Sequence, residues 1–256
     1  MVVAQQSGCQ FVDEEVLAVH PAGGLYTVES KGTVIEQVTD VVVAAGAFCN
    51  FRPLLCDPAG RPVQLELQLL TAQVAKIEVT EATVAEQGLG NMPSIIFKDT
   101  ARFWAYLLPP IKYPDGKIYM KIGGARYDEV ADSEASLPGL RVLRTEAEVN
   151  AWYGCRGDDA LHDKLLEMFE TLFPRVPVVR TVKDSCVTAH TPTKRAYIGH
   201  ARRGLSVVAG GNGYAAKSAD RIGALGALMV VEDPAWTDTL RQRFQPLYAS
   251  TAAAHL

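Results

Sequence analysis

Apolar and polar positions in the first fifty residues are arranged as in a series of short strands. Two β-rich runs, residues 11–19 and 25–29, flank the turn sequence HPAGG, and a second turn leads into a third run at 33–38. Residues 40–46 (DVVVAAG) then form a continuous apolar run that ends in glycine. Such a run is typical of a parallel strand covered on both faces. The pattern therefore predicts a β-meander followed by one strand of an α/β layer.

The middle of the chain changes to a strict period of two. Residues 63–69 (VQLELQL) alternate between apolar and polar side chains, and residues 117–122 (KIYMKI) repeat the alternation with Lys121 on the polar face. Successive side chains of a strand point to opposite faces of its sheet. We therefore predict half-buried antiparallel strands here, in a sheet distinct from the preceding α/β layer.

A helix and a further strand follow. Residues 159–173 have apolar side chains at helical spacing, and Pro174 ends the run before a strand-like segment at 178–182. The predicted apolar face of this helix consists of Leu161, Leu165, Met168 and Leu172.

The most informative segment is an apolar strand at residues 204–213 that enters a glycine-rich turn, followed by a helix at 215–231. Glycines allow positive φ and a close approach of ligand to backbone, and a helix start offers free N–H groups. Small residues recur every fourth position in the helix, at Ala219, Gly223 and Ala227, which predicts very close packing against a sheet. Taken alone, the pattern favours a tight turn without a ligand.

Composition narrows the class of protein. The 256 residues are 48% hydrophobic and 21% charged, with a net charge of -4 and no long run of one sign, so neither a nucleic-acid partner nor a polybasic membrane surface is expected. No apolar run approaches the roughly 18 residues of a membrane span. The five cysteines show neither CxxC nor zinc-ligand spacing, and no secretory signal pattern stands at the start. We expect a cytoplasmic protein with reduced thiols and no metal site.

Five segments carry a more specific signal, in a fixed order over nearly the whole chain. They are residues 40–48 (DVVVAAGAF), 61–63 (RPV), 115–123 (DGKIYMKIG), 186–192 (CVTAHTP) with 196–199 (AYIG), and 207–217 (VVAGGNGYAAK). In this order they resemble the C-terminal portion of the FAD-dependent amine oxidases of the D-amino-acid oxidase and monomeric sarcosine oxidase type. The resemblance implies FAD as the cofactor.

The resemblance also implies a fold and a domain organisation. An incomplete FAD-binding α/β layer is expected to interleave with a substrate domain built on an antiparallel β-sheet. Residues 1–60 would form part of the FAD-binding domain, residues 61–190 the substrate domain, and residues 191–256 the C-terminal part of the FAD-binding domain.

Residue roles follow from the same resemblance. Lys121 matches the lysine held above the flavin ring to activate oxygen, although a solvated strand lysine fits the pattern equally well. Lys217 matches the lysine that pairs with the substrate carboxylate, the alternative being a surface lysine. Cys186 matches the cysteine that carries flavin covalently, the alternative being a small buried strand residue. The expected cofactor contacts are Ala45, Gly46, Ala47, Cys186, Gly210, Gly211, Asn212, Gly213, Tyr214 and Lys217.

The chain departs from the family pattern in two ways. It contains no GxGxxG segment, the part that holds the FAD pyrophosphate. Tyr214, Ala216 and Thr193 also replace the usual histidine, phenylalanine and aspartate. We therefore expect a fragment, a truncated product, or one subunit whose partner chain carries the dinucleotide-binding half.

These features predict a flavin-dependent oxidase of a carboxylate-bearing amine or amino acid, which forms an imine and hydrogen peroxide. One alternative within the fold is a dehydrogenase of hydroxy acids or glycerol phosphate. A second alternative is a non-catalytic binding remnant, whose uncovered apolar surface would favour homo-oligomers or a partner chain. Nucleic acid and membrane are not expected as partners.

Overall fold

The computed structural model describes residues 2–99, 103–126 and 140–249. The chain separates into two compact units, and each is described by itself. Unit 1 takes in the residues up to Leu67 and those from Thr191 on, and unit 2 runs from Gln68 to His190. The domain boundaries that the family resemblance implies, after residues 60 and 190, stay a prediction.

Residues 64–66 belong to unit 1 because they pair with its C-terminal segment. Leu65 forms an antiparallel bridge with Tyr248, and the backbone N–H of Glu66 donates to the carbonyl of Leu247. The predicted alternation does hold for burial, since Leu65 and Leu69 are buried. The predicted strand at 63–69 is nevertheless wrong in its extent, because only its last two residues belong to a strand of the central sheet.

Unit 1 begins with the expected meander. After the short helix α1 (Val2–Gln6), the strands β1 (Val16–Ala22), β2 (Leu25–Ser30) and β3 (Val34–Val38) form an antiparallel sheet in that order. The first strand starts later than the sequence predicted. Phe11 and Val12 are 49% and 51% exposed and lie outside it.

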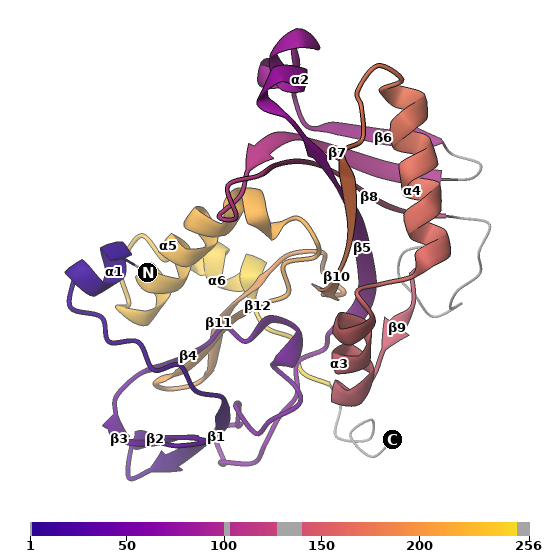
Figure 1. The fold of residues 1–256 in the computed structure, drawn as a ribbon. Coiled ribbons are helices and arrows are strands. Elements are labelled where there is room, and N and C mark those ends of the chain that lie inside the picture. The colour runs from indigo at the N-terminus through magenta and orange to yellow at the C-terminus, as the bar shows by residue number, and fades with distance from the viewer. Residues whose placement is uncertain (1, 100–102, 127–139, 250–256) are drawn as a thin grey trace. The chain divides into compact units, whose positions relative to one another are not determined.

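A second sheet in unit 1 has the order β11-β12-β4. Strands β11 (Tyr197–Arg202) and β12 (Leu205–Ala209) are antiparallel, whereas β12 and β4 (Val41–Val43) are parallel. Helices α5 (Ala219–Val230) and α6 (Asp238–Phe244) lie against one face of this sheet (Figure 1). The opposite face packs on side chains of the meander such as Val19 and Tyr26.

Two expectations for this sheet are wrong. Strand β4 was expected to be covered on both faces, but Val42 is 43% exposed because α5 packs over β11 and β12. The helix was expected to face the sheet through Ala219, Gly223 and Ala227, but all three are exposed. Leu225, Gly226 and Met229 face inward instead; a Cβ on Gly226 would lie 3.1 Å from a methyl group of Val208.

Unit 2 is built on an antiparallel sheet in the order β10-β5-β8-β7-β6. Its strands are β5 (Gln68–Val79), β6 (Ile95–Asp99), β7 (Phe103–Lys112), β8 (Ile118–Arg126) and β10 (Arg180–His190), and the short β9 (Val142–Leu143) also pairs with β5. The helices are α2 (Glu81–Glu86), α3 (Glu146–Cys155) and α4 (Asp159–Leu172). The structure thus confirms the prediction of mixed α/β and antiparallel layers.

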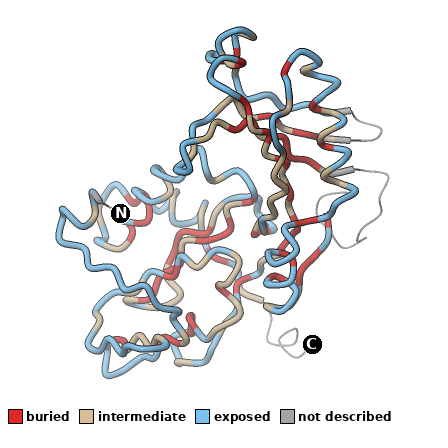
Figure 2. The backbone as a smooth tube through the Cα atoms, in the orientation of Figure 1, coloured by how far each residue is buried: buried red, intermediate tan, exposed pale blue. Residues whose placement is uncertain are grey.

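Helix α4 covers one face of the unit 2 sheet (Figure 1), and the strands beneath it contain many of the buried residues of unit 2 (Figure 2). Met120 and Ile122 of β8 are fully buried there with Leu165 and Phe169 of α4. The sequence pattern predicted that Leu172 would pack against the sheet, but Leu172 is 40% exposed and Phe169 is buried there instead. Of the helices in the described residues, none is both long enough and apolar enough to span a bilayer.

Two adjacent glycines of β8, Gly123 and Gly124, allow β7 and β8 to approach each other closely. A Cβ on Gly124 would lie 2.1 Å from the carbonyl oxygen of Trp104, so we expect Gly124→Ala to lower the free energy of unfolding by about 1–3 kcal/mol or more. Gly223→Ala is the matched control. No atom lies within 4 Å of its added Cβ, and the free energy of unfolding should rise by roughly 0.4–1 kcal/mol. Urea unfolding followed by circular dichroism measures both, and equal effects would contradict the packing argument.

Candidate functional site

The glycine-rich turn of unit 1 directly follows β12. Gly210, Asn212 and Gly213 have φ of 73°, 53° and 71°, the left-handed region that glycine and asparagine tolerate best. A Cβ on Gly210 would also lie 2.3 Å from Cγ2 of Thr191, and one on Gly211 would lie 2.7 Å from Cβ of Ala215. The first two glycines are therefore required by the packing of the turn itself.

The side chain of Asn212 stabilises this turn by hydrogen bonds inside it. Its side chain is buried, Oδ1 accepts the backbone N–H of Thr191 at 2.9 Å, and Nδ2 donates to the carbonyl of Gly210 at 2.6 Å. Both polar atoms of the side chain are thus used inside unit 1. Gly213 by contrast is exposed, and its N–H donates no backbone hydrogen bond among the described residues. The part of the turn that can meet a ligand is therefore the backbone around Gly213.

The second predicted turn follows β4. Ala45 precedes the 3-10 turn η1 (Gly46–Phe48), Gly46 has φ of 57°, and a Cβ there would meet no atom within 4 Å. Because β4 and β12 are parallel neighbours, the Ala45–Ala47 turn and the Gly210–Gly213 turn lie at the same edge of one sheet. Ligands of α/β sheets bind outside this carboxyl edge of the strands.

Tyr214 and Lys217 extend this edge. Tyr214 is 63% exposed, and the Lys217 ammonium lies 5.2 Å from the centroid of its ring. The sequence placed Lys217 one turn inside the helix. It lies instead in the 3-10 turn η3 (Ala215–Ser218) that precedes α5, and it is exposed. Its side chain is thus free of the helix and held only by the aromatic contact among the described residues.

Cys186 and Lys121, the predicted site residues of unit 2, lie on one face of its sheet. Cys186 pairs with Ala72, and Lys121 pairs with Lys76, on opposite sides of β5. Directly paired residues point to the same face, and Ala72 and Lys76 are separated by an even number of positions. Cys186 and Lys121 therefore point to the same face of the sheet, the one that α4 does not cover.

The Cys186 thiol is not activated by this environment alone. The residue is exposed, yet neighbouring groups shield the thiol, so desolvation and then the negative charge of Asp184 raise its pKa. Lys121 acts in the opposite direction and favours the thiolate. Nearby Tyr106, which the sequence did not single out, is withdrawn from water, and this raises its pKa to about 12. At neutral pH both groups are therefore mainly protonated.

The sequence also missed the residues that surround Lys121. Lys76 of β5 and Tyr113 of the hairpin between β7 and β8 lie close to it: the Lys121 ammonium is 4.9 Å from the centroid of the Tyr113 ring. Residues 68–79 do alternate in burial, which could have placed Lys76 on this face. No signal in the sequence indicates the contact with Tyr113, because it depends on how the hairpin folds over the strand.

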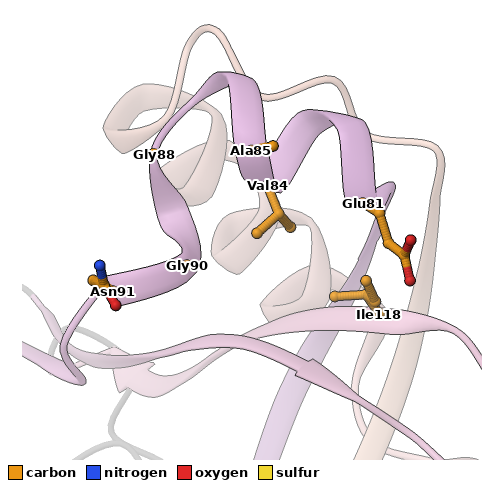
Figure 3. Close-up of a pocket in the computed structure, with 7 residues that line it drawn as sticks. All are labelled: Glu81, Val84, Ala85, Gly88, Gly90, Asn91 and Ile118. Carbon is orange, nitrogen blue, oxygen red and sulfur yellow. The ribbon is translucent and has the colours of Figure 1, made fainter.

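Two cavities of the described residues lie away from these predicted site residues. A shallow pocket of about 270 Å³ in unit 2 lies between α2, the turn η2 (Leu89–Asn91) and β8, and Glu81 is the only titratable side chain in its lining (Figure 3). A cavity of about 840 Å³ in unit 1 is lined by Asp40 and Gly204, which precede β4 and β12. It is therefore at the amino edge of the sheet, opposite the two turns.

The predicted site residues thus form two sets. The turns with Tyr214 and Lys217 belong to unit 1, whereas Lys121 and Cys186 belong to unit 2. That one flavin ring contacts both sets stays a prediction. Among the described residues no three His, Cys, Asp or Glu side chains gather as a metal site would require.

The residues present fit the flavin that the resemblance implies. Open space surrounds Gly46, and the Gly213 backbone is exposed at the same sheet edge, just before the positive end of the α5 dipole. On the unit 2 face, an exposed cysteine and a lysine lie together. Within unit 1, the Ala45–Ala47 and Gly210–Gly213 turns are the segments that would hold the ring.

Solved structures share this fold. The chain is similar to iminodiacetate oxidase from Chelativorans sp. BNC1, with 14% identity over 96% of this chain and 56% of that one and a TM-score of 0.60. Glycine oxidase from Geobacillus kaustophilus matches with 14% identity, 93% and 53% coverage and a TM-score of 0.57. Fructosyl peptide oxidase from E. terrenum matches with 14% identity, 95% and 54% coverage and a TM-score of 0.62. The chain spans about half the length of these structures.

The family itself is shown by sequence. No functionally curated protein matches the chain. The family model described as FAD dependent oxidoreductase (DAO), however, matches residues 1–229, most of the sequence. Together with the parallel β4–β12 pair and its two glycine turns, this match shows that the chain belongs to the DAO family of FAD-dependent oxidoreductases.

Proposed function

We propose that this chain forms part of a flavin-dependent oxidase that converts a carboxylate-bearing amine or amino acid into an imine and hydrogen peroxide. The observation that carries the proposal is the pair of glycine turns at one sheet edge of a chain that belongs to this family. The matching structures are named as oxidases of iminodiacetate, glycine and fructosyl peptides, and all of these compounds contain an amine and a carboxylate.

The residues of the chain have distinct parts in this reaction. When bound, FAD supplies the redox chemistry, taking a hydride from the carbon next to nitrogen and passing electrons to oxygen. Lys121 provides a fixed positive charge that stabilises negative charge as oxygen is reduced. Lys217 binds the substrate carboxylate as a point charge and so orients the amine. Its exposed position over Tyr214 leaves the ammonium accessible to such an anion.

We propose that the dinucleotide-binding part comes from polypeptide beyond the residues described, most simply a second chain. Strand β4 is the edge of its sheet, so its outer backbone groups are available for pairing. Val42 and Val231, at the edge strand and just after α5, are 43% and 70% exposed. A strand and helix added at this edge would cover such apolar side chains. Homo-oligomerisation is the alternative way to cover them.

We place the protein in the cytoplasm. The cysteines in the described part of the chain are all free thiols, as a reducing compartment favours.

The visible spectrum of the chain, purified together with any polypeptide that stays bound to it and with FAD added, tests the function. We expect flavin absorption to persist through gel filtration and an amine substrate to bleach it under nitrogen, with peroxide released when air is admitted. Dye reduction without peroxide would indicate the dehydrogenase instead. A preparation that stays colourless with added FAD, although the second polypeptide is present, would support a non-catalytic binding protein.

Cys186→Ser tests covalent attachment. The thiolate is the attacking species and the Cys186 pKa is raised, so attachment should accelerate as pH increases. Acid-precipitated wild type should remain yellow, and the Cys186→Ser protein should release its colour to the supernatant. Cys155→Ser, at another exposed cysteine, is the control and should keep the colour. Colour lost from the wild type itself would rule out the bond.

Lys217→Met tests carboxylate binding. Removal of one charge-assisted contact should raise the Kd of carboxylate-bearing amines by about 10- to 100-fold, because such bonds contribute roughly 1.5–3 kcal/mol. Neutral amines should bind nearly as before, and Lys217→Arg should restore part of the loss. Equal weakening for charged and neutral ligands, measured by spectral titration, would count against the assignment.

A further inference from the structure

Three lysines lie on the uncovered side of the unit 2 sheet: Lys76 on β5, Lys117 directly before β8, and Lys121 on β8. Two of them are paired with carboxylates. Lys117 Nζ lies 2.8 Å from an oxygen of Glu78, and Lys76 Nζ lies 2.9 Å from an oxygen of Asp184. Lys121 has no carboxylate partner within the described ranges. Its ammonium instead lies over the ring of Tyr113, 4.9 Å from the centroid.

Among the described residues, the strand register explains why Lys121, unlike Lys76, has no carboxylate partner. Lys76 and Lys121 are directly opposite each other on β5 and β8, so their charges repel. Asp184 on β10 borders Lys76 but is one strand further from Lys121. The carboxylate therefore neutralises the inner lysine, whose side chain is only 19% exposed, and no carboxylate of the described residues compensates the charge of Lys121.

The ring of Tyr113 is held in place by its own neighbours. Tyr119 contacts it edge to face, with centroids 5.3 Å apart and planes at 90°. The Tyr119 hydroxyl in turn donates to Asp115 at 2.9 Å, which ties the strand to the hairpin turn. Lys76 also lies 5.9 Å from the Tyr113 centroid. The ring thus offers a π-face to two ammonium groups at a fixed point.

We propose that Tyr113 is a positioning residue for Lys121, holding the ammonium by its ring face while leaving its positive charge free. A carboxylate at this place would neutralise the charge, whereas an aromatic face attracts a cation without cancelling it. The inference rests on the proposed function, in which Lys121 stabilises the anion formed as oxygen accepts electrons. It adds a residue that acts through its contact with Lys121.

The contact can be tested on the chain as purified, without flavin. Lysine side chains are labelled by reductive ¹³C-methylation, and the Lys121 resonance is identified by its loss in Lys121→Met. We expect this resonance to be shifted upfield by the ring current, to keep the shift in Tyr113→Phe, and to lose it in Tyr113→Leu and Tyr113→Gln. A resonance that does not move in the two variants without a ring overturns the proposal. Urea unfolding of each variant checks that the fold is retained.

The consequence for catalysis is measured by stopped flow on the flavin-loaded protein. Tyr113→Leu should slow flavin reoxidation by oxygen about three- to tenfold, leave flavin reduction by substrate unchanged, and be rescued by Tyr113→Phe. If Lys121→Met slows reoxidation and Tyr113→Leu does not, the positioning role is refuted while the proposed function stands. If neither variant slows reoxidation although the ring-current shift is lost, the role of Lys121 in the proposed function is refuted and the ring contact stands.

Discussion

The parallel pairing of β4 with β12 is the interaction on which the candidate site of unit 1 depends. Parallel neighbours bring the carboxyl ends of two strands to one edge although more than 150 residues separate them in the chain. Two turns therefore lie at that edge, one beginning near Gly46 and the other ending at Gly213. Because the Asn212 side chain satisfies buried backbone groups inside the second turn, the exposed backbone remains available to a ligand. A cofactor with a flat polar ring suits such an edge.

Charge distribution gives unit 2 its chemical character. Carboxylates neutralise two lysines of the uncovered sheet face, while the third, Lys121, lies over an aromatic ring. This ammonium is also the group that lowers the pKa of Cys186 against the effect of burial. One cation therefore serves two proposed purposes, stabilising an anion and favouring a thiolate. Both follow from alternation on neighbouring antiparallel strands, which brings β8 and β10 side chains to a common face.

The family assignment rests on the sequence match, whereas the reaction is proposed from the site residues. The family model covers residues 1–229, and the fold agrees with oxidases about twice as long. The reaction requires FAD, and the segment that holds its pyrophosphate in this family is not among the motifs of this chain. The free edge of β4 and the exposed Val42 are where further polypeptide would pair. Under the proposed function, this chain would contribute the two turns of unit 1 and the sheet of unit 2 to such an oxidase.

The sequence by itself determined the order of the layers, the inward and outward sides of β8, and the glycine turn after β12, because alternation and glycine placement are local properties of the chain. It also carried the family resemblance, which the comparisons confirmed. Tertiary structure alone decided that Phe169 rather than Leu172 packs on the sheet, that the small residues of α5 face outward, and that Lys121 rests on Tyr113. These depend on which face of an element another segment covers, and that is set by contacts between residues distant in sequence.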